Sequence, residues 1–514
     1  MTIQTLADLP RVQAAERPEA RALIFGSRVT NYGALDRAAS QVAQALLGLG
    51  LAPGARVVVL DRESDHALEI LLGAAKARVV VSYLSWRLAP AEVLAVLADA
   101  EPSVLFVGPD FAGRSGELRA ATPSLEAVIE MARYPEWRDA AAPIDPLLPV
   151  SPEDVAVQMY TSGTTGQPKG VRLAHRSFFS VVLGIKAAWG NWIEWSPEDI
   201  ALHTLPNSHI GGLWWAVRVM AEGATSVLMD SFAGFKVIEL VQAHRVSKLC
   251  LVPAMMQVVL SEPSMAGADF SSTRYLMYGG SPTPPALLQR AMTAFGCRFY
   301  QVYGLTETGN MAVWLAPDDH SDPAAERFGS AGRPYPGVEA KVIDREGRSL
   351  GPRAVGEICL YSPARMVEYW RRPEETARTL IDGWIHTGDA GYFDEAGYLY
   401  VSDRVKDMII YAGENIYPAE VENALYDHPA VKEVAVIGVP DDKWGELVKA
   451  IVVVKPGTDP SPIELIAHAR PKIAAYKLPK SVDFVSELPR TRSGKVKKEE
   501  LRAPYWKGRS RNVN

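Results

Sequence analysis

The sequence predicts an α/β protein with a large N-terminal domain of layered sheets plus a small distorted β-barrel, followed by a small mobile α+β domain. Its 514 residues exceed one ordinary domain and are enough to build at least two cores. In the N-terminal half, short apolar strands alternate with helical segments, which is the pattern of mostly parallel sheets covered by helices. After residue 329, glycine and proline punctuate short β segments, which indicates a small barrel or sheet.

The first elements follow this alternation in order. Amphipathic or helical patterns predict helices at residues 32–49 and 66–77. Short apolar runs predict strands at residues 56–60, 79–82, 104–107 and 155–160. A similar alternation runs from residue 200 to 315, so the same layered architecture is expected there.

The remaining elements belong to the smaller units. Residues 338–343 and 356–361 are expected as strands of the barrel, and a polar crossing follows at residues 401–408. We place the domain boundary at residues 403–407, which gives domains at residues 1–403 and 404–514. After the crossing we expect a βαβ-like unit, with a helix at residues 420–426 and strands at residues 434–438 and 450–454.

Composition narrows the class of protein. With 48% hydrophobic and 22% charged residues, the chain is predicted to be globular and not disordered. No apolar run approaches the roughly 20 residues that a membrane helix needs, and the N-terminus lacks the pattern of a signal peptide. The three cysteines are scattered without metal or disulfide spacing, which suits a reducing cytoplasm. We therefore expect a cytoplasmic protein without a membrane span.

The net charge of −6 hides an asymmetry between the two parts of the chain. Residues 404–514 carry a net charge of +4, so the remainder carries −10. A small basic domain on an acidic body could meet a phosphate-rich ligand, although composition alone slightly favours a solvated helix face and tail. Nucleic acid is not expected as a partner, because the basic run lacks interleaved aromatic residues and the whole chain is acidic.

The loop after the strand at residues 155–160 is the most informative segment, Tyr160-Thr-Ser-Gly-Thr-Thr-Gly-Gln-Pro-Lys-Gly170. Its glycines allow tight turns, its hydroxyl groups suit phosphate oxygens, and its lysine adds a positive charge. A Walker A loop would need Gly-Lys-Ser/Thr at its end, whereas Pro168, Lys169 and Gly170 stand there. The segment is therefore interpreted as a nucleotide-phosphate loop of another kind, whose candidate residues are Thr161, Ser162, Gly163, Thr164, Thr165, Gly166 and Lys169.

Further segments carry residues suited to chemistry. A loop with a histidine, residues 205–212, precedes an aromatic run. Residues 278–281 are a strand end followed by a glycine turn, and residues 301–308 combine an aromatic ring, a glycine, a hydroxyl and a carboxylate. A tight turn then presents one carboxylate, and a basic loop lies near the C-terminus. Taken singly, each residue has a plain structural explanation as a buried histidine, a helix cap, a turn residue or a solvated lysine. The residues concerned are His209; Gly279, Gly280 and Ser281; Gln301, Val302, Tyr303, Gly304, Thr306 and Glu307; Asp389; and Lys495.

Together and in this order, these segments resemble the adenylate-forming superfamily of acyl-CoA synthetases, luciferases and nonribosomal adenylation domains. The resemblance covers residues 32–501, and the segment at residues 408–420 is most similar to that of the fatty-acyl- and aryl-CoA ligases. It implies an AMP-forming acid–thiol ligase, in which a carboxylic acid and ATP give an acyl-adenylate and pyrophosphate. The acyl group would then pass to the thiol of CoA, with release of AMP. ATP, Mg²⁺ and CoA are the implied cofactor and co-substrates.

The resemblance implies a role for each matching position. Residues 161–169 would hold the β- and γ-phosphates, while residues 279–281 and 301–303 would frame the adenine, with the Tyr303 ring stacked on it. Thr306 would contact the α-phosphate, and Glu307 would bind Mg²⁺. The remaining roles are ribose binding by Asp389 with Arg404, catalysis by Lys495 at the α-phosphate, shaping of the acyl site by His209, and a hinge at Lys406.

The resemblance also implies a CoA site and an acyl pocket. Gly413 and Glu414 would line the thiol tunnel, and Trp444, Lys477 and Lys480 would lie near the CoA nucleotide, although Trp444 could equally be a core anchor. No acidic residue accompanies His209, which argues against an amino acid as substrate. The expected pocket is apolar, and it suits a medium or long fatty acid or a bulky aromatic acid. Its candidate residues are Trp214, Met255, Met256, Tyr278, Gly304, Asn310 and Met311, with Asn310 as a polar group for a substrate hydroxyl.

Alternatives remain open at this level. The acceptor could be the phosphopantetheine of a carrier protein, which shares its thiol arm with CoA. A non-enzymatic nucleotide-binding protein would need neither Glu307 nor Lys495, and a hydrolase is disfavoured because no Gly-x-Ser-x-Gly elbow occurs. A homodimer is one possible assembly. The tryptophan-rich segment at residues 189–195 receives no role from the sequence.

Overall fold

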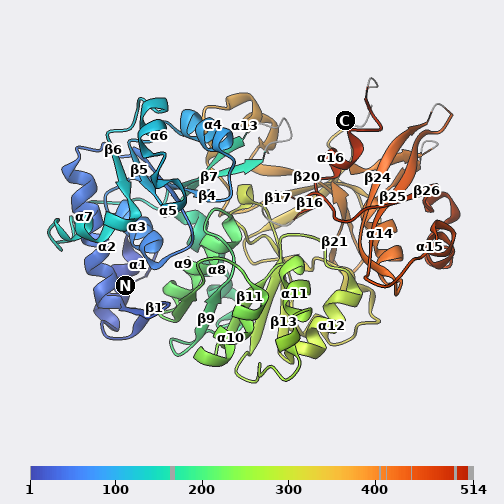
Figure 1. The fold of residues 1–514 in the computed structure, drawn as a ribbon, viewed down its shortest axis with the longest axis horizontal. Helices are drawn as coiled ribbons and strands as arrows, with labels where there is room; N and C mark the ends of the chain where they lie inside the picture. The colour runs from blue at the N-terminus through green and yellow to red at the C-terminus, as the bar shows by residue number, and fades with distance from the viewer. Residues whose placement is uncertain are drawn as a thin grey trace.

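A computed structural model describes residues 2–162, 168–404, 407–411, 414–441, 443–490 and 495–507. These residues build four sheets, of seven, nine, five and five strands. Figure 1 shows the first part of the chain and the C-terminal strands at opposite ends of the molecule, with the green and yellow elements between and below them. Within the described part of the chain, no helix is long and apolar enough to cross a membrane.

The seven-stranded sheet has the order β18-β8-β7-β4-β3-β5-β6. Its strands β3 to β7 run parallel, and β8 and β18 are added antiparallel at one edge. On β3, Val57 and Val59 face the core shared with α2 and α3, while Val58 and Leu60 face the core of α4. The strands are β3 (Arg56–Asp61), β4 (Val80–Ser85), β5 (Val104–Val107), β6 (Ala127–Glu130), β7 (Val155–Ser162), β8 (Pro168–Ala174) and β18 (Glu368–Tyr369).

Seven helices accompany the first part of the chain. They are α1 (Asp8–Glu16), α2 (Tyr32–Gly48), α3 (Asp65–Lys76), α4 (Pro90–Ala100), α5 (Pro109–Ala112), α6 (Ser115–Ala121) and α7 (Tyr134–Asp139). Asn31 begins α2 by accepting a hydrogen bond from the backbone of Ala34, which satisfies one of the unpaired amides of the first turn. The predicted helices at residues 32–49 and 66–77 are confirmed to within one residue.

The nine-stranded sheet has the order β15-β14-β13-β12-β11-β9-β10-β1-β2. Helices α8 and α9 pack on the face that carries Tyr275 and Met277, and α10, α11 and α12 cover the face that carries Leu276 and Tyr278. The helices are α8 (Arg176–Trp189), α9 (Ile210–Ala221), α10 (Gly234–His244), α11 (Pro253–Leu260) and α12 (Pro285–Phe295). The strands are β1 (Arg21–Phe25), β2 (Arg28–Asn31), β9 (Ile200–His203), β10 (Thr225–Leu228), β11 (Lys248–Leu251), β12 (Tyr275–Gly279), β13 (Arg298–Tyr303), β14 (Val313–Leu315) and β15 (Arg333–Pro334).

A five-stranded antiparallel sheet follows, as the change of texture after residue 329 predicts. It has the order β16-β17-β20-β19, with β21 paired to β20, and α13 (Pro373–Thr379) precedes β19. Its two predicted strands are confirmed. The bounds are β16 (Glu339–Ile343), β17 (Gly356–Tyr361), β19 (Leu380–Ile381), β20 (Trp384–Phe393) and β21 (Leu399–Arg404).

The last sheet begins after residue 407 and has its own core. Here one prediction is wrong: β24 and β25 are adjacent antiparallel strands, so residues 434–454 form no βαβ unit. The parallel crossover occurs later, where α15 joins β25 to β26. The elements are β22 (Ile409–Tyr411), β23 (Glu414–Ile416), α14 (Pro418–Tyr426), β24 (Val431–Asp441), β25 (Gly445–Val454), α15 (Pro462–Ala469), β26 (Ser481–Phe484) and α16 (Lys498–Arg502).

Candidate active site

The strands that flank the predicted phosphate loop are firmly held. Thr161 on β7 pairs with Lys169 on β8, and the backbone amide of Trp370 donates to the carbonyl of Gly170 at 2.7 Å. The hydroxyl of Tyr160 donates to Asp99 Oδ2 at 2.8 Å. Gly163, Thr164, Thr165 and Gly166 lie outside the described residues, and Ser162 is described by its backbone alone. The proposed loop therefore begins and ends on an ordered hairpin.

Two charged side chains lie against the ring of Tyr369. Lys169 Nζ is 5.4 Å from the ring centroid and 3.6 Å from Glu375 Oε1. The Tyr369 hydroxyl donates to Glu307 Oε1 at 2.7 Å. Burial and the nearby Glu307 carboxylate raise the pKa of Tyr369, so the phenol stays protonated and remains a donor. The predicted phosphate lysine and the predicted magnesium ligand therefore share one neighbour.

Glu307 lies in a short 3₁₀ turn, Thr306–Thr308, directly after β13. The turn is fixed to the rest of the protein because the backbone amide of Met366 donates to the Glu307 carbonyl at 2.7 Å. A partly exposed carboxylate, with one oxygen oriented by a tyrosine, is a donor of the kind that Mg²⁺ takes alongside phosphate oxygens. The residues present therefore fit a magnesium ion at Glu307.

The ring and the carboxylate that the sequence assigns to the nucleoside also meet. The hydroxyl of Tyr303, at the end of β13, donates to Asp389 Oδ2 at 2.8 Å, although 86 residues separate them. Asp389 is only 8% exposed, and it lies opposite Arg404 in the pairing of β20 with β21. The side chain of Arg404 lies outside the described part of the structure. At the candidate site, this contact joins the nine-stranded sheet to the five-stranded antiparallel sheet that contains β20, called the barrel sheet below.

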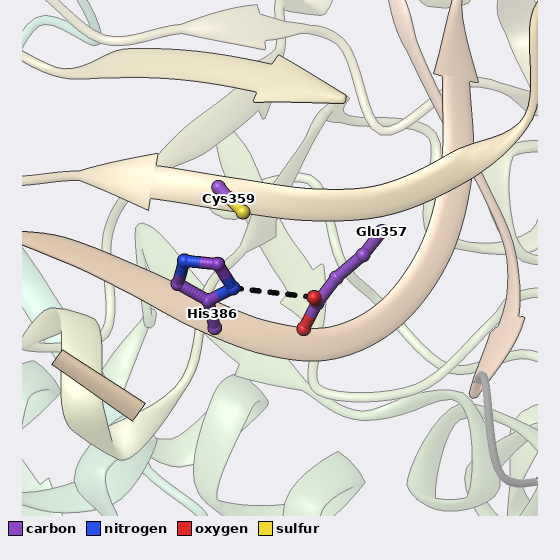
Figure 2. Close-up of side chains that lie close together, drawn as sticks. All are labelled: Glu357, Cys359 and His386. Carbon is purple, nitrogen blue, oxygen red and sulfur yellow. Dashed lines mark hydrogen bonds and ion pairs between the residues drawn. The ribbon is translucent and has the colours of Figure 1, made fainter. Parts of the chain in front are cut away.

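Glu357, Cys359 and His386, shown in Figure 2, lie close together beside the turn that leads to Asp389. Cys359 on β17 lies opposite His386 on β20, and Glu357 Oε2 is 3.2 Å from His386 Nδ1. The other Glu357 oxygen accepts from the Gly388 amide at 3.0 Å. The three ligand-type atoms lie within 4.8 Å of one another, but burial raises the pKa of the Cys359 thiol to about 12 and keeps it protonated. We therefore interpret the trio as a structural brace.

Glycine is required at two positions that frame the site. A Cβ atom added to Gly279 would lie 2.1 Å from the Val302 carbonyl oxygen, and one added to Gly304 would lie 1.7 Å from the Asn310 carbonyl oxygen. Gly280 adopts φ +79°, which also favours glycine. Val302 is buried, whereas Gln301 and Ser281 are partly exposed at the same strand ends. The predicted adenine frame therefore consists largely of close-packed backbone.

The His209 loop reaches the same strand ends from the other side. His209 immediately precedes α9, and Gly212 permits the turn because an added Cβ would lie 2.3 Å from the Pro206 carbonyl oxygen. An added Cβ at Gly211 would lie 3.9 Å from Asn310 Oδ1, so the two loops are neighbours. Asn310 adopts φ +82°, and its buried Nδ2 has no hydrogen-bond partner in the described structure. Such a strained residue with an unmatched donor is a candidate ligand contact.

The seven predicted acyl-pocket residues do not line one pocket. Trp214 and Met311 belong to the core on the α9 face of the nine-stranded sheet, whereas Met255, Met256 and Tyr278 pack on the opposite face. The Tyr278 hydroxyl lies 2.9 Å from His320 Nε2, so it is engaged in that second core. Side chains alternate along a strand, and the residues of β12 that share the face of Trp214 are Tyr275 and Met277. The assignments of Met255, Met256 and Tyr278 are therefore withdrawn.

The C-terminal domain presents an aromatic and basic surface. Trp444 is 39% exposed, so the alternative that it is a buried core anchor is wrong. Its ring lies 5.7 Å from that of Tyr411. Lys480 Nζ lies 5.2 Å from the Tyr411 ring, and Lys477 pairs with Glu420 at 2.6 Å. Lys406 and Gly413 lie outside the described residues, as does the side chain of Glu414, while Lys495 is exposed.

One contact between the domains has no signal in the sequence. The hydroxyl of Tyr426 on α14 donates to Gln257 Oε1 on α11 at 2.8 Å. The two residues are 169 positions apart, and neither belongs to a recognisable motif. The contact ties the C-terminal domain to the large domain in the arrangement observed.

Comparisons with known proteins agree with this geometry. The sequence pattern described as AMP-binding enzyme matches residues 10–370, and that of the AMP-binding enzyme C-terminal domain matches residues 420–495. The chain belongs to the AMP-binding enzyme family. It is 45% identical over 514 residues to the fatty acid–[acyl-carrier-protein] ligase ScoC of Streptomyces coeruleorubidus, covering 100% of this chain and 98% of that protein.

Two further relatives place this AMP-binding enzyme among acid ligases. It is 38% identical over 507 residues to the feruloyl-CoA synthase of an Amycolatopsis species, covering 98% of this chain and 100% of that one. The anthranilate CoA ligase AuaEII, solved with anthranoyl-AMP, superposes with a TM-score of 0.90 at 27% identity, covering 98% of this chain and 97% of that one. The predicted superfamily and fold class are confirmed. The chain is an ATP-dependent, adenylate-forming acid–thiol ligase.

Proposed function

We propose that this enzyme activates a carboxylic acid at the strand ends around Gly304 and passes the acyl group to the thiol of CoA. The observation that carries the proposal is the pair of tyrosine–carboxylate contacts, Tyr303 to Asp389 and Tyr369 to Glu307. These contacts bring the proposed nucleoside, metal and phosphate groups together around one short stretch of chain. We take the acid to be an apolar or aromatic one, because Trp214 and Met311 belong to the apolar core on the α9 face of the nine-stranded sheet.

The chemistry requires a leaving group at the carboxylate. Attack of a carboxylate oxygen on the α-phosphorus of ATP forms a carboxyl–phosphate bond and breaks the bond to pyrophosphate. The acyl carbon then carries AMP, which the thiol sulfur displaces as the thioester forms. Glu307 would hold Mg²⁺, which supplies positive charge to the phosphate oxygens as they become more negative. Thr306 precedes Glu307 in the same 3₁₀ turn and would contact the α-phosphate.

Lys495 would stabilise the charge that develops at the α-phosphate. It belongs to the C-terminal domain, so its approach depends on the position of that domain. We propose the boundary at residues 403–407 with a hinge at Lys406, and the change from the barrel sheet to the last sheet between Arg404 and Ile409 supports this. Rotation there would withdraw Lys495 after the first step and bring residues 413–414 to the thiol path.

Two acceptors carry a phosphopantetheine thiol, namely CoA and a carrier protein. The ring pair of the exposed Trp444 and the partly buried Tyr411, with Lys443 and Lys480 beside it, suits the adenine nucleotide of CoA. The 45% identity to a ligase named for an acyl-carrier protein favours a carrier protein as the second candidate. A carrier protein has no adenine nucleotide, so the two acceptors should depend differently on Trp444.

The test is an acid panel with ATP, scored for pyrophosphate, AMP and thioester. We expect acid-dependent pyrophosphate release that falls strongly in Glu307→Gln, and thioester formation with CoA that weakens in Trp444→Ala. Acid-independent nucleotide binding without pyrophosphate release would overturn the proposal. Thioester formed only on a holo-carrier protein, unchanged by Trp444→Ala, would select the second candidate.

A further inference from the structure

The tryptophan-rich segment at residues 189–195 lies in an aromatic cluster on the α9 face of the nine-stranded sheet. The Trp192 ring is 4.7 Å from that of Trp314, 5.4 Å from Tyr335 and 5.7 Å from Tyr300. Trp314 and Tyr335 are stacked on each other at 5.5 Å. The segment therefore contributes two rings, Trp189 and Trp192, to a cluster that also contains Tyr300, Trp314 and Tyr335.

This cluster lies below the proposed acid-activation site on the same face. Tyr300 and Val302 point into the core that also contains Trp214 and Met311, and Trp314 pairs with Val302 in the sheet. Four residues of strand separate Gly304 from Tyr300, which corresponds to roughly 13 Å at about 3.3 Å per residue. An acid whose carboxylate lies near Gly304 and whose body follows this face would direct its far end at the cluster.

The cluster contains hydrogen-bond donors that have no partner in the described structure. They are the buried Trp192 Nε1, Tyr335 hydroxyl and Arg218 Nε atoms. Tyr335 is 1% exposed, and Arg218 is buried on α9, one turn beyond Trp214. The Arg218 guanidinium lies 5.6 Å from the ring centroid of Trp195, which belongs to the same segment as Trp192. Buried polar groups are nearly always paired, so this concentration of unmatched donors indicates a ligand atom.

The charge around these donors favours an acceptor. Arg218 lies 2.6 Å from Glu222, but Lys186 lies 2.7 Å from the same carboxylate. One carboxylate therefore faces two cations, and a net positive charge remains beside the Trp192 and Tyr335 donors. A plain alkyl end would leave these donors unpaired, whereas an oxygen atom would accept from them.

We propose that Trp192, Tyr335 and Arg218 form the far end of the acyl site and select an acid that carries a hydrogen-bond-accepting oxygen distant from its carboxylate. The inference rests on the proposed function, because it takes the carboxylate position from it. The class is an extended or planar acid with a terminal hydroxyl, carbonyl or ether oxygen. This narrows the apolar pocket expected from the sequence to one with a polar end.

The test compares matched acids that differ by one oxygen. The probes are cinnamic and 4-hydroxycinnamic acid, and octanoic and 8-hydroxyoctanoic acid, with kcat/KM measured from pyrophosphate release. We expect the oxygenated acid to be favoured about tenfold or more in at least one pair, because a site built to hydrogen-bond a group discriminates against its absence. Tyr335→Phe and Trp192→Phe should lower that ratio toward one, with the ratio taken between the two acids of a pair within each variant.

Tyr275→Phe is the matched control, because the Tyr275 hydroxyl already has a partner in Arg298 at 3.0 Å. This variant should keep the preference of the wild type. Equal turnover within both pairs would overturn the inference and leave the proposed function standing. So would a preference that survives in Tyr335→Phe, Trp192→Phe and Arg218→Met alike. No pyrophosphate release with any acid would instead contradict the proposed function.

Discussion

Lys248 is a buried lysine whose charge should be visible in the pH dependence of stability. Its side chain is 0% exposed, and Nζ donates to the Ile193 carbonyl at 2.5 Å. Asp199 lies 3.8 Å away, and the Tyr275 ring centroid lies 4.1 Å away. The ammonium therefore ties the segment that carries Trp192 to the end of β11, at the cost of losing its water.

Burial lowers the pKa of Lys248 from 10.5 to about 7, and the attraction of Asp199 only partly opposes this. Between these values the unfolded chain binds more protons than the folded one. The free energy of unfolding should therefore rise with pH from about 7 to about 10.5, by up to about 1.4 kcal/mol per pH unit from this group. Below pH 7 the cost of the buried charge is fully present, and above 10.5 it is gone.

Lys248→Met keeps the length of the side chain and removes the titration. The assay is chemical unfolding of both proteins by tryptophan fluorescence at pH 7, 8 and 9, read as the difference between their free energies of unfolding. The wild type should gain stability relative to Lys248→Met by about 1 kcal/mol or more per pH unit. Lys236→Met, which removes a partly exposed ammonium paired with Asp230, is the control and should show no such trend. A difference between wild type and Lys248→Met that stays constant across this range would refute the reasoning.

Three further predictions concern the active site. Lys495→Ala should lower the kcat of acyl-adenylate formation by about 10²-fold or more, while thioester formation from supplied acyl-adenylate is retained. Equal loss of both half-reactions would contradict domain rotation. Tyr303→Phe removes the 2.8 Å hydrogen bond to Asp389, so the KM for ATP should rise about tenfold in steady-state assays, and an unchanged KM would separate this pair from nucleotide binding. Gly304→Ala forces a Cβ to within 1.7 Å of a backbone oxygen, so Tm and activity should both fall, and a fully active variant would show that this turn is not rigid.

Much of the architecture could be predicted because it depends on local burial. The apolar runs at β3 and β5 must be covered on both faces, and the structure confirms that they are. The contact of Tyr303 with Asp389 was accessible only through the resemblance of the motifs. Nothing local to either residue indicates a partner 86 positions away.

The errors share a physical origin. A continuous apolar run does not show which side chains face which layer, so Tyr278 was grouped with Trp214, although Met277 and not Tyr278 shares the core of Trp214. An apolar run also does not show the direction of a strand relative to its neighbour. A βαβ-like unit was therefore expected where β24 and β25 form an antiparallel pair. Strand parity relative to an anchored residue such as Tyr275 would have corrected the first error. The second depends on tertiary pairing, which composition does not encode.

The charge balance of the site gives a physical reason for carrying Lys495 on a separate C-terminal domain. Glu307 and Asp389 each accept a hydrogen bond from a tyrosine hydroxyl, and Lys169 is already paired with Glu375. A site with this many carboxylates on a body of net charge −10 would repel ATP unless positive charge came from elsewhere. This supports the proposal that Mg²⁺ and Lys495 supply it, the latter on a domain of net charge +4. The proposed rotation of that domain would withdraw the same charge once pyrophosphate has left, which a lysine fixed in the phosphate loop could not do.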